Sequence, residues 1–166
     1  MRVKLSELIP EHFHSLWHAA KDKGKLNIVA KGGRGSGKSS DIAIIIVLLI
    51  MRYPVNALIL RKIDNTLALS VFEQIKWAIN VMGVSHLFKI KVSPMEITYV
   101  PRGNKMVFRG AQNPERIKSL KDAQFPYAIA WIEELAEFKT EDEVTTITNS
   151  LLRGDCLLYT SPSPRD

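Results

Sequence analysis

The chain has 166 residues, of which 46% are hydrophobic, and this length and composition suit a single globular domain. Its formal net charge is +6 but is unevenly spread: residues 1–62 carry eleven Lys and Arg against four acids, and residues 133–166 carry three against eight. A basic body favours a polyanionic partner, nucleic acid first, although lysines that only solubilise exposed faces would give the same count.

Other features exclude whole classes of protein. The single cysteine, Cys156, excludes a disulfide framework and a cysteine-ligated metal cluster. The first residues lack the apolar core of a signal peptide, and the longest apolar run, residues 42–51, is too short to span a bilayer. We therefore expect a soluble, intracellular protein.

In chain order, the first predicted elements are a helix over residues 6–20 and a short apolar strand over residues 26–30. The glycine-rich loop that follows fits the phosphate-binding pattern G-x-x-x-x-G-K-[ST] at every required position. Its glycines let backbone N–H groups surround a phosphate chain at the positive end of the next helix. A loop of this kind could also begin a helix without binding anything, but strand, loop and helix together predict a nucleoside triphosphate site. The predicted nucleotide-binding residues are Gly32, Gly33, Arg34, Gly35, Ser36, Gly37, Lys38, Ser39 and Ser40.

Two side chains of this loop have chemical roles in the pattern. Lys38 would reach the β- and γ-phosphates, and the Ser39 hydroxyl would ligate Mg²⁺. The loop opens a long apolar helix over residues 38–53, and a buried strand follows over residues 57–60. Arg61 and Lys62 come at the end of that strand, on the side of a parallel sheet where ligands bind.

The middle of the chain predicts a helix and then an antiparallel unit. The apolar spacing favours a helix over residues 64–82. A strand is expected over residues 88–92. Residues 97–100 and 105–108 alternate around a turn and predict a β-hairpin.

A second candidate for chemistry lies at the end of another strand. Residues 127–132 form a continuous apolar run, typical of a parallel strand covered on both faces, and Glu133 and Glu134 follow directly. In nucleoside triphosphatases, acids at this place organise Mg²⁺ and polarise the attacking water, so we assign Glu133 to the metal and Glu134 to the water. The usual metal-side residue is Asp, so Glu133 is a departure. The pair could instead begin a solvated acidic loop that leads to a last helix near residue 141.

These segments together resemble the large terminase subunit of tailed bacteriophages, in the branch found in prophages of Gram-positive bacteria. The carriers of the resemblance are KGGRGSGKSS, LILRK, SPMEITYVPRGNKMVFRGAQNPERIKSLKD, YAIAWIEELAEF and SLLRGD. The family implies an α/β P-loop NTPase fold with a mostly parallel sheet flanked by helices and a hairpin insertion near residues 95–109. It also implies catalysis by Glu134, Lys38 and Arg34, the last as a contact to the γ-phosphate. The Glu-Glu strand end is shared with this branch of the family.

The resemblance also implies a role and partners. It predicts an ATPase that uses ATP and Mg²⁺ to drive double-stranded DNA into an empty capsid. The partners would be the portal protein, a small terminase subunit and further copies of the chain in a ring. The location would be the cytoplasm of the bacterial host and, transiently, the procapsid portal. Arg102, Lys105 and Arg109, on or beside the hairpin, are the first candidates for contacts to DNA phosphates.

The resemblance covers residues 1–155, which we expect to be a fragment of the ATPase domain, incomplete at its C-terminus and without the nuclease domain of the family. Residues 156–166 are not family-like and look like a translated sequencing adapter, although a disordered Pro/Ser tail would have the same composition. In this division of NTPases the strand after the Glu-Glu strand lies between it and the phosphate-loop strand. The fragment would then lack a central strand and leave two unpaired edges, unless residues 157–160 fill the place.

Two other functional classes fit the same residues. A helicase-like or recombination motor would share the phosphate loop and the acidic strand end, and would prefer single-stranded nucleic acid. A non-catalytic nucleotide-binding or assembly module would keep the loop and lack turnover.

Overall fold

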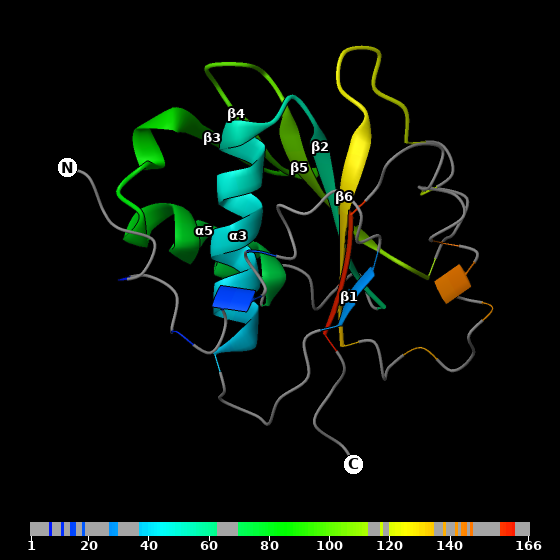
Figure 1. Cartoon of the computed structure of the whole chain (residues 1–166). Helices are drawn as coiled ribbons and strands as arrows, with labels where there is room; N and C mark the ends of the chain where they lie inside the picture. The colour runs from blue at the N-terminus through cyan, green and yellow to red at the C-terminus, as the bar shows by residue number, and fades with distance from the viewer. Residues whose placement is uncertain are drawn as a thin grey trace.

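A computed structural model describes residues 27–29, 37–62, 70–112, 120–134 and 157–161, together with isolated residues 7, 11, 14, 15, 18, 117, 138, 142, 144, 145 and 147. Seven strands form one sheet in the order β1-β7-β6-β2-β5-β4-β3 (Figure 1). Their bounds are β1 (Asn27–Val29), β2 (Asn56–Arg61), β3 (Phe88–Val92), β4 (Met95–Tyr99), β5 (Lys105–Gly110), β6 (Tyr127–Glu133) and β7 (Leu157–Ser161). The first five strands in this order pair in parallel, and the last two pairings, β5 with β4 and β4 with β3, are antiparallel. The predicted α/β class with a mostly parallel sheet is therefore confirmed.

Helices α3 (Lys38–Arg52) and α5 (Val71–Val81) lie together on one face of the sheet (Figure 1). The two faces of β2 follow from the alternation of its side chains. Ala57 and Ile59 pack with these helices, whereas Leu58 and Leu60 pack on the opposite face in a second apolar cluster. Helix α3 is apolar almost all round because it is buried against both the sheet and α5. Both faces of β2, β5 and β6 are thus covered, as expected for parallel strands with continuous apolar runs.

Strand β7 occupies the central place between β1 and β6. It pairs in parallel with β1 on one side and with β6 on the other, so that Ile132 lies in register with Thr160, and Thr160 with Val29. Residues 157–161 fill this place, which the sequence left open as the alternative to a missing central strand. The expectation of two unpaired edges inside the sheet was wrong, because backbone pairing along a strand requires only an extended segment of sufficient length and no particular side chains.

The antiparallel end of the sheet contains the predicted hairpin and extends it. Strands β4 and β5 pair as the alternation of their sequence predicts. However, β5 also pairs in parallel with β2, and β3 adds a further antiparallel strand beyond β4. The hairpin is therefore the continuation of the main sheet. The predicted helix over residues 64–82 is present as α5 over its second part, while residues 63–69 lie outside the described residues.

The turn between β4 and β5 is fixed to the C-terminal end of α3. The Asn104 amide is fully buried, and its Nδ2 donates to the carbonyl oxygens of Ile50 at 2.9 Å, Tyr53 at 3.2 Å and Val55 at 2.9 Å. The Arg102 guanidinium donates to the carbonyl of Met51 at 3.2 Å. Carbonyls at the end of a helix have no partner within the helix, so these two side chains cap α3. None of the described helices is long and apolar enough to cross a bilayer.

Candidate functional site

The first turn of α3 presents the described part of the glycine-rich loop. Gly37 precedes the helix with φ +80°, a left-handed conformation that strains any other residue. A larger residue at position 37 would be disfavoured by this backbone angle and not by lack of space, because an added Cβ would meet only Asp41 Oδ2, at 3.7 Å. Lys38 and Asp41 are both buried in this first turn, with 7% and 3% of their surfaces exposed. Residues 32–36, which include Arg34, lie outside the described residues.

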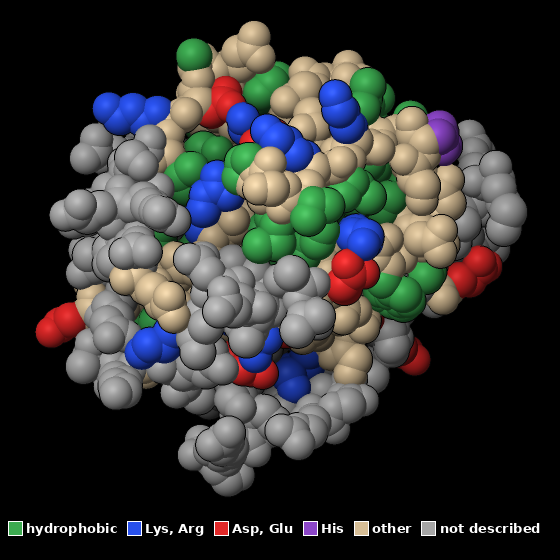
Figure 2. Space-filling model, turned by 180° about the vertical axis from the view of Figure 1, so that it is seen from behind, with side chains coloured by type: hydrophobic (Ala, Val, Ile, Leu, Met, Phe, Trp, Pro, Cys, Tyr) green, Lys and Arg blue, Asp and Glu red, His purple; other side chains and the backbone are tan. Residues whose placement is uncertain are grey.

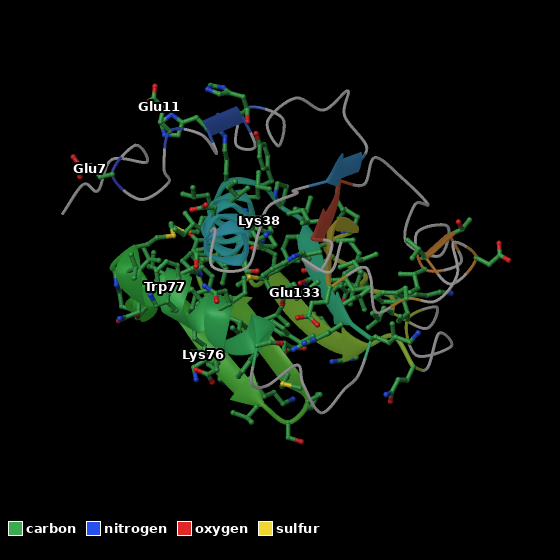
Figure 3. The ribbon with its side chains drawn as sticks, turned by 90° about the horizontal axis from the view of Figure 1, so that it is seen from below. Glu7, Glu11, Lys38, Lys76, Trp77 and Glu133 are labelled. Atoms are coloured by element: carbon green, nitrogen blue, oxygen red, sulfur yellow. The ribbon has the colours of Figure 1, made fainter. Side chains whose placement is uncertain are left out.

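Ser39 and Glu133 are joined although 94 residues separate them in the sequence. The Ser39 hydroxyl donates to Glu133 Oε1 at 2.8 Å. Glu133 is the last residue of β6 and therefore reaches the sheet edge that faces the start of α3. In Figure 3, Lys38 and Glu133 are drawn close together near the centre of the molecule, at the start of α3 and the end of β6. The second oxygen of the carboxyl, Oε2, is buried and has no hydrogen-bond partner among the described residues.

The environment of Glu133 affects its ionisation. Burial raises the pKa of this carboxyl, and the nearby Glu134 acts in the same direction. The hydrogen bond from Ser39 and the positive charge of Arg61 oppose the increase. A buried carboxyl with one unpartnered oxygen is costly to keep ionised, and a cation beside that oxygen would offset the cost.

Glu134 is held differently from its neighbour. Its Oε2 forms an ion pair with the Arg61 guanidinium at 2.7 Å, and its backbone has φ +52°, unusual for a residue with a side chain. Arg61 ends β2, which lies beside β6, so the ends of two adjacent parallel strands supply the two partners. The sequence pointed to this edge for Arg61 but assigned it no partner. The pairing depends on the order of the strands, which a single sequence does not give.

Ser40, the last predicted nucleotide contact, has a partner on α5. Gln74 Nε2 donates to Ser40 Oγ at 2.8 Å. Sequence reasoning missed Gln74, which lies 34 residues further on and has no motif around it. The only available signal was that α5 follows β2 and must pack next to α3.

The basic side chains proposed for DNA have contacts within the chain. Lys105 Nζ lies 3.7 Å from Glu96 Oε2 and 3.5 Å from Asp122 Oδ2, and Arg109 donates to the carbonyl of Phe108 at 2.7 Å. On the face shown in Figure 2, Lys and Arg side chains are dispersed among hydrophobic and uncharged ones. Of the three hairpin candidates, Arg102 has a structural role at the end of α3.

Comparison with known proteins identifies relatives of the whole described sheet and of the residues around it. A sequence model of the phage terminase large subunit family matches residues 25–165. The terminase large subunit of Bacillus phage SPP1 is 49% identical over 154 residues, which are 93% of this chain and 36% of that relative. The chain therefore spans about a third of the length of this relative.

Solved structures show the same fold. The large terminase ATPase domain of Thermus phage P74-26 matches with a TM-score of 0.71 and 16% identity, over 99% of this chain and 70% of that domain. The large terminase of a thermophilic bacteriophage, solved in complex with ADP, also matches with a TM-score of 0.71, at 14% identity, over 92% of this chain and 38% of that protein. At such low identity these structures establish the fold alone. The sequence matches establish the family, and the chain belongs to the phage terminase large subunits.

Proposed function

We propose that this chain is the ATP-binding and ATP-hydrolysing motor domain of a DNA-packaging terminase, which couples hydrolysis to the movement of double-stranded DNA into a procapsid. The observation that carries the proposal is the 2.8 Å hydrogen bond between Ser39 and Glu133. It joins the two halves of a nucleotide site, the helix start after the glycine-rich loop and the acidic end of β6. Membership of the terminase family supplies the biological setting.

The side chains around this bond suit a Mg²⁺–nucleotide complex. In this proposal Lys38 would meet the β- and γ-phosphates, and backbone N–H groups of the glycine-rich loop would surround the phosphate chain. Ser39 Oγ and Glu133 would hold Mg²⁺, directly or through water, because Mg²⁺ prefers oxygen ligands and Glu133 Oε2 is buried without a partner among the described residues. When bound, Mg²⁺ would neutralise charge that develops on the phosphate oxygens.

Glu134 is the proposed base for the attacking water, and Arg34 the proposed contact to the γ-phosphate. A carboxylate that is ion-paired to a guanidinium is a poor proton acceptor, so the Arg61 contact has to open before Glu134 can act. The exposure of the Glu134 side chain, 38%, leaves room for that movement. A positive group at residue 34 would stabilise the charge of the transferred phosphoryl group.

The proposed partners follow from the family. They are double-stranded DNA, the portal protein, the small terminase subunit and further copies of this chain in a ring, in the bacterial cytoplasm and at the procapsid portal. Contacts to DNA are expected to involve phosphates, since the net charge of +6 favours a polyanion without specifying its sequence. No nuclease activity is proposed for this chain.

The test is hydrolysis of ATP by a chain extended to the full length of its relatives. Glu134→Gln should keep ATP bound and slow DNA-stimulated hydrolysis on the order of 10²-fold or more, the usual loss when a positioned base is removed. Glu73→Gln, at an exposed position on α5, is the matched control and should leave the rate unchanged. Normal hydrolysis by Glu134→Gln would show that the base lies elsewhere.

A further inference from the structure

The contact between Gln74 and Ser40 links a helix without any recognised motif to the phosphate-binding turn. Ser40 lies in the first turn of α3, next to Ser39, and Gln74 lies one turn into α5. The distance of 2.8 Å between Gln74 Nε2 and Ser40 Oγ is that of a well-formed hydrogen bond. Both side chains are half-buried, so water competes only partly for the bond.

The direction of this bond determines what the Ser40 hydroxyl can do. A hydroxyl has one proton to donate and two lone pairs that accept. The Gln74 amide nitrogen donates a hydrogen bond to a lone pair of Ser40 Oγ. An amide nitrogen is not an acceptor, so it cannot take the proton of the Ser40 hydroxyl. The proton is therefore available for a different acceptor. Beside the N-terminus of a helix, the favoured acceptor is an anion.

We infer that Gln74 is a positioning residue that orients the Ser40 hydroxyl as a hydrogen-bond donor to the phosphate chain of the nucleotide. The inference rests on the proposed function, since it assumes that a nucleotide occupies this turn. Gln74 itself does not contact the phosphate in this account. It fixes the direction in which the Ser40 hydroxyl donates, which lowers the conformational entropy lost when Ser40 binds the phosphate.

A purely structural role for Gln74 would be to hold α5 against α3. Five apolar residues of α5 already do this: Val71, Phe72, Ile75, Ala78 and Ile79 are buried. Phe72 also packs edge-to-face on Phe108 of β5, with 5.0 Å between ring centroids. Apolar burial is thus sufficient to fix the position of α5. The Gln74 hydrogen bond is not needed for this, and its role is to orient Ser40.

A double-mutant cycle separates the two roles. Gln74→Met keeps the length of the side chain and removes the donor, Ser40→Ala removes the hydroxyl, and the cycle is completed by the double variant. Binding of Mg·ADP to the 166-residue chain is measured by titration, together with the melting temperature of each variant. Gln124→Met, at an exposed position before β6, is the matched control.

The expected result is a coupling that appears in affinity. Gln74→Met should weaken Mg·ADP binding about threefold to tenfold in the parent, the scale of one hydrogen bond, and should have no effect in the Ser40→Ala background. An equal loss in both backgrounds, or no loss in either, would overturn the inference while leaving the nucleotide site in place. A parent chain that fails to bind Mg·ADP would instead overturn the proposed function, and the inference with it.

Discussion

Removal of β7 is the perturbation with the largest expected effect on the fold. A chain ending at Asp155 loses a central strand that pairs with β1 at three positions and with β6 at five. A backbone hydrogen bond contributes a net free energy of about 0.5–1.5 kcal/mol, and loss of both ladders should therefore cost on the order of 5 kcal/mol. The whole free energy of unfolding of such a domain is only about 5–15 kcal/mol. With a change of about 2–4 °C per kcal/mol at this size, the melting temperature should fall by at least about 10 °C.

The assay is thermal unfolding followed by circular dichroism. A chain ending at Ser161 is the matched control, since it loses residues 162–166 and keeps all of β7. Tyr159→Pro is a second test that keeps the length, because proline removes a backbone donor from the middle of the strand and should destabilise the sheet without truncation. A chain ending at Asp155 that melts within about 3 °C of the parent would show that residues 157–161 do not occupy the sheet.

Three further predictions concern the end of α3, the buried carboxyl and DNA. Asn104→Ala should lower the free energy of unfolding by about 2–4 kcal/mol, because the carbonyls at the end of α3 lose their buried donor. Denaturant titration measures the change. Asn80→Ala, on the exposed face of α5, is the control and should change the free energy little. Glu133→Gln should raise the melting temperature of the nucleotide-free chain at neutral pH and abolish any further increase by Mg·ATP. Burial raises the pKa of Glu133, so the folded parent favours the protonated carboxyl and is more stable at low pH. As the pH rises past the ordinary glutamate pKa, the parent loses stability and the Gln variant does not. The difference in melting temperature between the two should therefore increase with pH. Affinity for duplex DNA should fall at least tenfold between about 50 and 200 mM salt and vary little with sequence, and a strong preference for single strands would contradict a packaging role.

The parts of the fold that the sequence predicts well are those set by local patterns. The glycine-rich loop and the apolar run after it place the start of α3 at Lys38, where the structure has it, and the continuous run before Glu133 predicts β6. Both depend on residue types at fixed spacing. The hairpin of β4 and β5 follows in the same way from alternation around a turn.

The contacts that the sequence did not predict join segments far apart in the chain. The Arg61–Glu134 ion pair requires that β2 and β6 be neighbours, and the Gln74–Ser40 bond requires a particular rotation of α5 against α3. Neither condition leaves a signal near the residues concerned. For Arg102 the sequence suggested a contact to DNA from a basic residue beside a turn, and it gave no sign that the guanidinium also caps α3. Charge in a sequence does not tell which carbonyls lie within reach.

We propose that the start of α3 and the end of β6 together form one Mg·ATP site. Titration of the 166-residue chain with Mg·ATP measures binding at this site, and circular dichroism checks that each variant is folded. Lys38→Ala should weaken binding at least tenfold, since a charge-assisted bond to phosphate is lost, whereas Lys89→Ala at an exposed position of β3 should bind as the parent does. Equal affinities for the parent and Lys38→Ala would contradict the claim.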